Sequence, residues 1–370
     1  MHLKNLFLLN FRNYQETKII FHNGINVIYG ENGSGKTNIL EAIYFLALTK
    51  SFRTNSERHL VFNNQDMFRI KGEFENTQGR VIDCSIAYAL TEGKRLVVNS
   101  QKFLKFSDYI GEVPTVLLEP SDLTLSQGSP YQRRRFIDLL LCQSHKLYLH
   151  HLMQYNRSLK QRNQILQSEK FDQQILYSWE ENLIKNGMEI IKKRRETIEY
   201  LSETVKNYYT LLSNKDDKIK IVYQSNVEEK NNQTLESAYR QQFDMNRASE
   251  IEAGHTKVGP HRDELLFLLK GKPMRIHSSQ GEHKTFVIAL KLAEFFYLQK
   301  HRSETPILLF DDIFGELDAN RIQLMLNQLS DFGQVFVTTT SKNFFNKVEE
   351  FSKPVQYFNV QNGEVTFEAN

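Results

Sequence analysis

The segment GENGSGKT, Gly30 to Thr37, matches the pattern G-x-x-x-x-G-K-[ST] and decides the fold of this 370-residue chain. It follows the apolar segment INVIY at residues 25–29 and precedes residues 39–48, in which apolar side chains recur with helical spacing. A strand, a glycine-rich loop and a helix in this order direct backbone N–H groups and a helix N-terminus toward phosphate. The sequence therefore predicts an ATP-binding loop that consists of Gly30, Glu31, Asn32, Gly33, Ser34, Gly35, Lys36 and Thr37.

Each residue type in this loop suits one part of a triphosphate with its Mg²⁺ ion. Gly33 and Gly35 can adopt positive φ angles, which let the backbone approach the ligand closely. Lys36 places a positive charge beside the β and γ phosphates, so we expect it to bind ATP and to take part in catalysis. The hydroxyl group of Thr37 is a predicted ligand of Mg²⁺.

The segment ILLFDD at residues 307–312 supplies two carboxylates to the predicted site. Four apolar residues indicate a buried strand, and α/β sheets bind their ligands at the carboxyl ends of such strands. Asp311 is expected to hold Mg²⁺, directly or through a water molecule. Asp312 stands where a base could orient the attacking water.

A third candidate segment is HSSQGEHK at residues 277–284, which precedes an apolar helical pattern. Ser279 and Glu282 have the S-x-x-E spacing of a capping box, in which each side chain bonds a backbone N–H group of the helix start. A capped N-terminus that contains a glycine is also an anion-binding site. The candidate binding residues here are Ser279, Gln280, Gly281 and Glu282.

The rest of the sequence indicates an α/β fold with two additions. Residues 60–118 contain short alternating segments punctuated by glycine, which favour an antiparallel β wing. Residues 130–212 are charged, rich in Gln and Asn and nearly free of proline, which favours helices. Near-heptad apolar spacing over residues 171–213 predicts either one helix of about 60 Å or a helix pair folded at Gly187.

The remaining elements follow from the same patterns. We expect two strands over residues 3–28 with a turn at Asn23-Gly24, strands at 219–223, 265–269, 306–311 and 335–339, helices at 280–300 and 320–329, and a hairpin around Asn362-Gly363. Nearly continuous apolar strands that alternate with helices indicate a largely parallel sheet covered on both faces. The predicted head comprises residues 1–120 plus 255–370, and the inserted, mainly helical arm comprises residues 121–254.

Composition excludes several classes of protein. Hydrophobic residues at 40% and charged residues at 25% are typical of folded globular chains. No apolar run approaches the roughly 18 residues of a membrane-spanning helix, so we expect no membrane partner. Two cysteines cannot build a disulfide framework, which favours a cytoplasmic protein. A net charge of +3 permits nucleic-acid binding without requiring it. The basic clusters are candidate DNA contacts or solvated helix faces: Arg133, Arg134, Arg135, Lys192, Lys193, Arg194 and Arg195, with Arg53 next.

The order of these motifs resembles the ATP-binding cassette (ABC) class of ATPase heads, and further blocks resemble the RecF family of that class. The blocks are FRNY at 11–14, GENGSGKTNILEAIYFLA from residue 30, SFR at 51–53, EPSDLTLSQGSPYQRRRFID at 119–138, RSLKQRN at 157–163, GPHRDEL at 259–265 and SQGEHKTFVIALKLAE at 279–294. They span nearly the whole chain. The resemblance implies a P-loop head of the ABC/SMC type with an antiparallel wing and a short helical arm.

Membership of this class implies a site shared by two subunits. The serine–glycine segment of one subunit contacts the γ-phosphate bound to the other, so Ser279 to Glu282 would act across an ATP-dependent homodimer. The segment GELD at 315–318 resembles the D-loop of the class and places Asp318 there. By the same resemblance Asp311, Asp312 and Lys36 are the catalytic residues.

The RecF resemblance further implies a role in recombinational repair. Members of the family bind single- and double-stranded DNA with ATP, hydrolyse ATP weakly as a switch, and with RecO and RecR help to load RecA at gaps. The resemblance also implies support of replication restart and of the SOS response. An ATPase subunit of an ABC transporter is the alternative interpretation, because head architecture alone is compatible with it; the long helical insertion between Lys36 and Asp311 argues against it.

Overall fold

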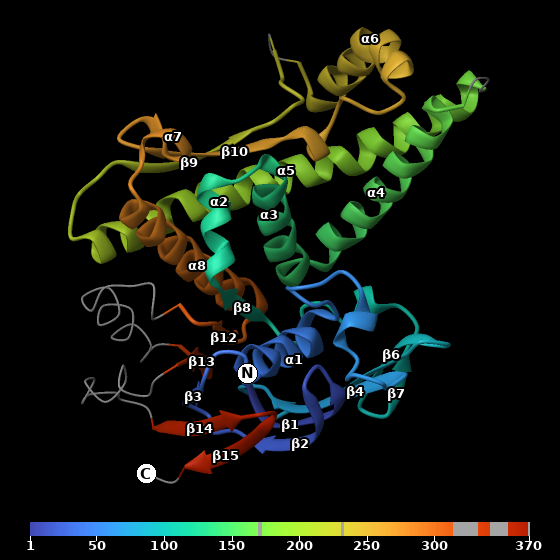
Figure 1. Cartoon of the computed structure of the whole chain (residues 1–370). Helices are drawn as coiled ribbons and strands as arrows, with labels where there is room; N and C mark the ends of the chain where they lie inside the picture. Colours follow the sequence, from blue (N-terminus) through green and yellow to red (C-terminus); the bar gives the residue numbers. More distant parts are fainter. Residues whose placement is uncertain (169–171, 231–232, 314–331, 341–353, 369–370) are drawn as a thin grey trace. The chain divides into compact units, whose positions relative to one another are not determined.

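The computed structural model describes residues 1–168, 172–230, 233–313, 332–340 and 354–368. The chain forms two compact units, and each is described by itself (Figure 1). The first unit contains Met1–Leu123, Thr210–Lys215 and the chain from Lys284 onward; the second contains Thr124–Tyr209 and Asp216–His283.

A six-stranded, mostly parallel sheet forms the centre of the first unit. Its strands lie in the order β15 (Glu364–Glu368), β14 (Val355–Gln361), β3 (Ile25–Tyr29), β13 (Val335–Thr339), β12 (Ile307–Phe310) and β8 (Thr115–Leu118). The strands from β14 to β8 are parallel, and β15 pairs antiparallel at one edge. All residues of β8, β12 and β13 are buried, which explains why their sequences are mostly apolar and do not alternate between apolar and polar residues.

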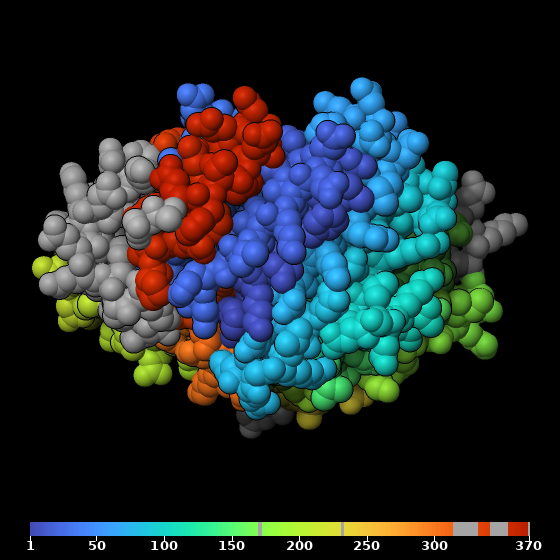
Figure 2. Space-filling view, turned by 90° about the horizontal axis from the view of Figure 1, so that it is seen from below, coloured from blue at the N-terminus to red at the C-terminus, as the bar shows by residue number. Residues whose placement is uncertain are grey.

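The second sheet of this unit is the antiparallel wing. Its order is β2 (Tyr14–Ile20), β1 (His2–Phe11), β4 (Met67–Glu75), β5 (Val81–Ala89), β6 (Gly93–Val98) and β7 (Gln101–Phe103). Helix α1 (Lys36–Leu48) packs against β4 and β5 on one side and against β8 and β13 on the other, and is buried almost all round (Figure 1). Figure 2 shows the N-terminal strands beside the C-terminal hairpin, where β2 contacts β15.

The second unit is mainly helical. Its helices are α2 (Leu123–Gln127), α3 (Pro130–Ser144), α4 (Lys146–Leu166), α5 (Gln173–Ser213), α6 (Leu235–Ala253) and α7 (Met274–His277), and α8 (Gln280–Arg302) begins here. Strands β11 (Lys272–Pro273), β10 (Glu264–Leu269) and β9 (Ile219–Gln224) form a small antiparallel sheet. Helix α5 runs for 41 residues without a break at Gly187. A Cβ atom at Gly187 would lie 2.6 Å from the hydroxyl oxygen of Tyr239, so the glycine permits close packing on α6.

The structure confirms the predicted class, an α/β P-loop head with an antiparallel wing and an inserted helical region. The N-terminal prediction of two strands is wrong: three strands form, because the chain reverses at Arg12-Asn13 and crosses at residues 21–24 from the antiparallel sheet to the parallel one. The predicted strand at 265–269 forms but pairs with β9 in the second unit. Residues 255–283, which the sequence division assigned to the head, lie in that unit as well. The predicted helix at 320–329 lies outside the described residues.

Candidate nucleotide site

The loop that joins β3 to α1 has the backbone of a phosphate-binding loop. Gly30, Gly33 and Gly35 have φ angles of 154°, 83° and 118°, values that residues with a Cβ atom rarely adopt. Gly35 is the residue that precedes α1, which begins at Lys36. The first N–H groups of an α-helix lack i−4 carbonyl partners within it, so the start of α1 offers N–H donors and the positive end of the helix dipole to an anion.

Asn13, in the β1–β2 turn, and Tyr14, the first residue of β2, hold the loop in place. The side-chain amide of Asn13 donates to the carbonyl oxygen of Ser34 at 2.9 Å, and the hydroxyl of Tyr14 donates to that of Gly35 at 3.0 Å. The N–H group of Gly363, in the turn of the C-terminal hairpin, also donates to Ser34 at 3.3 Å. Asn13 and Tyr14 belong to the FRNY block, which the sequence marked without giving it a role in the site.

Arg12 and Arg53 belong to a second network beneath the loop. The guanidinium of Arg12 makes two hydrogen bonds, of 2.8 and 2.7 Å, to the fully buried carboxylate of Glu41 on α1. Arg53 lies 3.6 Å from the same carboxylate and donates to Asn38 at 2.7 Å. Since bidentate charged hydrogen bonds are strong and directional, this network fixes α1 relative to the turn that supports the loop.

The side chains of the loop itself suit a triphosphate. The ammonium group of Lys36 folds back on the loop and donates to the carbonyl oxygens of Gly30 and Glu31, both at 2.8 Å. Burial lowers the pKa of Lys36, against the attraction of Asp312 and Asp311. The buried hydroxyl of Ser34 has no hydrogen-bond partner in the described part of the chain, and a Cβ atom at Gly33 would meet no atom within 4 Å. An unpaired hydroxyl and open space above the loop fit a bound phosphate chain.

Asp311 joins the loop to the carboxyl ends of two strands. Its Oδ1 atom accepts hydrogen bonds from the hydroxyls of Thr37 at 2.8 Å and Thr338 at 2.7 Å. Asp312 follows with an exposed side chain and a φ of 46°, and its N–H group donates to Thr338 at 2.9 Å. The hydroxyl of Thr37 and the carboxylate of Asp311 supply neighbouring oxygen atoms, the type of ligand that Mg²⁺ prefers. The structure therefore brings together Lys36, Thr37, Asp311 and Asp312, and adds Thr338.

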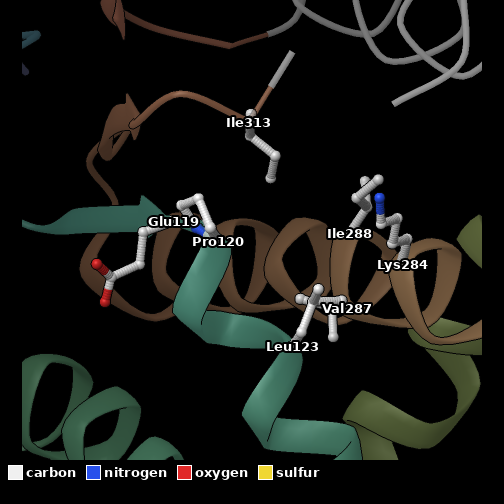
Figure 3. A pocket seen from close by; sticks show the side chains of 7 residues that line it. All are labelled: Glu119, Pro120, Leu123, Lys284, Val287, Ile288 and Ile313. Carbon is white, nitrogen blue, oxygen red and sulfur yellow. The ribbon is translucent and has the colours of Figure 1, made fainter. Parts of the chain in front are cut away.

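Glu119 is a further carboxylate at this edge of the sheet. It follows β8 directly, and the N–H group of Asp311 donates to Leu118, the last residue of β8, at 2.9 Å. Burial raises the pKa of Glu119 to about 7, although a hydrogen bond from Ser121 opposes the shift. Figure 3 shows the carboxylate pointing away from the small groove that Val287, Ile288 and Ile313 line. The sequence named Glu119 only as part of a family block.

The predicted signature segment forms the start of α8, in the second unit. The N–H group and hydroxyl of Ser279 donate to Glu282 Oε2 at 2.7 and 3.0 Å, and the N–H group of Glu282 donates back to the Ser279 hydroxyl at 3.3 Å. The bond from the Ser279 backbone lowers the pKa of Glu282. The capping box is thus present, and Ser279 and Gln280 remain exposed. Asp318 of the predicted D-loop lies outside the described residues.

The basic clusters are divided between buried and exposed side chains. Arg133 and Arg194 are 5% and 2% exposed and pair with Glu264 and with Asp138 and Asp263. Burial in ion pairs argues against phosphate contacts by these two guanidinium groups. Four others lie at or near the surface, where Lys192, Lys193 and Arg195 pair with Glu189, Glu196 and Glu229 and Arg135 is exposed. Arg134 is half-buried and donates to the carbonyl oxygen of Asp263.

Comparisons with known proteins bear on the family and the fold of the chain. Residues 2–366 match the family described as RecF/RecN/SMC N terminal domain. A DNA replication and repair protein RecF of Streptococcus gordonii strain Challis is 36% identical over 367 residues, which cover 99% of this chain and all of the relative. The chain belongs to the RecF family. A RecF of Streptococcus pneumoniae is also 36% identical, over the full length of both chains.

Solved structures place this RecF-family chain in the same fold. The recombination mediator RecF–ATPrS of the RecFOR pathway superposes with a TM-score of 0.91 at 30% identity, covering 100% of this chain and 98% of that one. An Smc head bound to the C-winged helix domain of ScpA has a TM-score of 0.57 at 17% identity and shares the fold. Among the described helices, none is long and apolar enough to span a bilayer.

Proposed function

We propose that this protein is an ATP-dependent DNA-binding protein of recombinational repair whose heads dimerise when ATP binds. One observation carries the proposal: Asp311 bonds Thr37 beside Lys36 in a loop whose buried Ser34 hydroxyl lacks a partner among the described residues. Two RecF structures of similar fold, one with ATP and one with ATPrS, support nucleotide binding at this loop.

Different residues of the site bind the nucleotide and promote its hydrolysis. The loop N–H groups and Lys36 hold and orient the phosphates, as in other P-loop proteins. Thr37 and Asp311 would hold Mg²⁺, which when bound neutralises phosphate charge. Asp312 has an exposed carboxylate at the strand end and accepts the proton of the attacking water. We expect slow, DNA-dependent hydrolysis that resets the dimer, so that ATP acts as a switch.

The partner half of the site would be the signature segment of a second copy. Ser279 and Gln280 are exposed at the N-terminus of a 23-residue helix, and Glu282 is turned back onto that helix start as its cap. A capped helix start of this kind binds the γ-phosphate of the opposite subunit through N–H groups and the helix dipole. Asp318, in the predicted D-loop, belongs to the same proposed interface.

The cellular role extends the proposal beyond the site. With the partners RecO and RecR, the protein would help to load RecA at single-stranded gaps, and would support replication restart and the SOS response. Its substrates would be single- and double-stranded DNA, at gaps or junctions. The protein would act in the cytoplasm of a bacterium, where the chromosome lies. Whole-length identity of 36% to RecF proteins favours this role over a transporter subunit.

Two variants test the proposed dimer. Lys36→Ala should abolish ATP-dependent dimer formation in sedimentation velocity, because the phosphates lose their positive partner. Ser279→Arg should leave ATP binding to the monomer intact while it blocks the dimer. A dimer that persists in Lys36→Ala, or a monomer of Ser279→Arg that no longer binds ATP, would contradict the arrangement.

DNA binding is tested separately, by a mobility shift over a salt series with and without ATP. If phosphates are contacted, log K should fall with log[salt] by about 0.9 for each duplex phosphate neutralised. The exposed Arg135 and the surface residues Lys192, Lys193 and Arg195 are the candidates, and reversing the charge of any one should lower the slope. An unchanged slope would place the DNA surface elsewhere.

A further inference from the structure

The signature segment is held within the second unit by the last turn of α2, which carries Ser126 and Gln127. The side-chain amide of Gln127 donates to Gln280 Oε1 at 3.2 Å. The hydroxyl of Ser126 and Nδ1 of His283 form a buried hydrogen bond of 2.9 Å, and the two residues are 1% and 3% exposed. The first turn of α8 is therefore fixed at two points, one on each side of Gly281 and Glu282.

The shape of that turn depends on Arg133. Its Nη1 group donates to the carbonyl oxygens of Gly128 at 2.9 Å and Leu125 at 3.4 Å. The backbone also folds tightly at Gly128, where a Cβ atom would lie 2.1 Å from Gln132 Oε1 and 2.5 Å from the Thr124 carbonyl oxygen. One guanidinium group thus ties both ends of the turn that carries Ser126 and Gln127.

Arg133 is itself fixed by β10. Its Nε and Nη2 groups donate to the two carboxylate oxygens of Glu264 at 2.8 and 2.9 Å. The guanidinium lies 5.9 Å from the ring centre of Phe267. A planar fork with five donors suits this role because it bonds a carboxylate with one edge and carbonyl groups with the other; a lysine ammonium offers no such geometry.

We propose that Arg133 is a positioning residue for the signature segment, acting through Glu264 on one side and the turn at Ser126 and Gln127 on the other. Its task is to set the start of α8 in the orientation that meets the γ-phosphate of the partner copy. The inference rests on the proposed ATP-dependent dimer. It assigns Arg133 to that dimer and not to DNA.

The first test separates dimerisation from nucleotide binding. Arg133→Gln and Arg133→Lys should each raise the dissociation constant of the ATP-dependent dimer about tenfold, the effect of losing one charged hydrogen-bond pair. ATP binding by the monomer should stay within about twofold, because Arg133 bonds Glu264, Leu125 and Gly128, which lie outside the loop at residues 30–37. Arg157→Gln, which removes an exposed arginine of α4, is the matched control and should dimerise as the unaltered chain does.

The second test is complementation between tagged protomers that are mixed with ATP. In a pair of Arg133→Gln with Lys36→Ala, one site combines an intact loop with an intact signature segment, so dimers should reappear above the level of either variant alone. In a pair of Arg133→Gln with Ser279→Arg, both sites contain a damaged signature segment and no recovery is expected. A merely destabilised chain would fail in both mixtures.

The outcomes distinguish the inference from the function on which it rests. If Lys36→Ala and Ser279→Arg do not complement one another, the shared site is wrong. If they do, while Arg133→Gln with Lys36→Ala does not, only the role of Arg133 is overturned. Should Arg133→Gln unfold, Ser126→Ala removes the hydrogen bond to His283 and takes its place in both mixtures. Dimerisation of Ser126→Ala with unchanged affinity would also overturn the inference.

Discussion

Replacing Gly33 and Gly35 in turn tests whether the loop is built as described. Both residues have positive φ angles, but their surroundings differ. Among the described residues, a Cβ atom at Gly33 would meet no atom within 4 Å, whereas one at Gly35 would lie 2.5 Å from the amide nitrogen of Asn13 and 2.8 Å from the hydroxyl of Tyr14. Gly33→Ala therefore adds backbone strain alone, and Gly35→Ala also displaces two groups that support the loop.

The difference can be put into free energies of unfolding. A left-handed conformation costs an alanine roughly 1–2 kcal/mol, of which about 0.4–1 is offset by the lower entropy of the unfolded chain. Gly35→Ala breaks in addition the hydrogen bonds from Asn13 to Ser34 and from Tyr14 to Gly35, each with a net contribution of about 1 kcal/mol. We expect losses of about 1 kcal/mol for Gly33→Ala and about 3 kcal/mol for Gly35→Ala.

Thermal unfolding and ATP titration together provide the assay. At roughly 2–4 °C per kcal/mol for a unit of this size, Tm should fall by about 3 °C for Gly33→Ala and about 9 °C for Gly35→Ala. The added methyl group at Gly33 enters the space where phosphate would lie, so ATP affinity should fall at least about tenfold although the fold persists. Equal losses of Tm, or full ATP affinity in Gly33→Ala, would refute this description of the loop.

Three further predictions concern buried charged and titratable groups. Asp311→Asn keeps the Oδ1 acceptor of Thr37 and Thr338, so Tm should stay within about 3 °C, the equivalent of 1 kcal/mol, while Mg²⁺-dependent ATP binding is lost in calorimetry. Arg162→Met should cost about 3–5 kcal/mol in denaturant unfolding, because it deprives the fully buried carboxylate of Glu250 of its arginine partner and leaves Glu180 with Arg247; a neutral effect would contradict it. Burial lowers the pKa of His261 to about 4, below its value of about 6.5 in the unfolded chain. The contribution of this histidine to the free energy of unfolding is therefore fully present above pH 6.5, and about 3 kcal/mol is lost as the pH drops to 4. Replacing His261 with Gln should flatten that pH dependence, and an unchanged slope would exclude this histidine as its source.

The grouping of residues at the candidate nucleotide site was predictable because these residues are close together in sequence or follow buried strands. Gly30 to Thr37 and Asp311 carry patterns in which residue type and spacing reflect the chemistry directly. The capping box of Ser279 and Glu282 is equally local. Thr338 was not assigned a role, since a threonine at the end of a strand becomes an Asp311 partner only when β13 lies beside β12.

The burial of the basic clusters could not be predicted from the local sequence. The run from Arg133 to Arg135 is uniform in sequence, yet β10 places Glu264 against the first residue alone, and Arg133 is buried while Arg135 is exposed. Arg194 differs from its neighbours in the same way, because Asp138 and Asp263 come from distant parts of the chain. Long-range pairing of this kind leaves no periodic signal, so composition could not separate structural arginines from surface ones.

The molar mass of the protein in solution, measured by sedimentation velocity with a nonhydrolysable ATP analogue and with or without DNA, tests the central claim most directly. The proposed function predicts a monomer without nucleotide and a doubled mass with the analogue, strengthened by DNA and absent in Lys36→Ala. A chain that is saturated with the analogue and remains a monomer, with or without DNA, would contradict it.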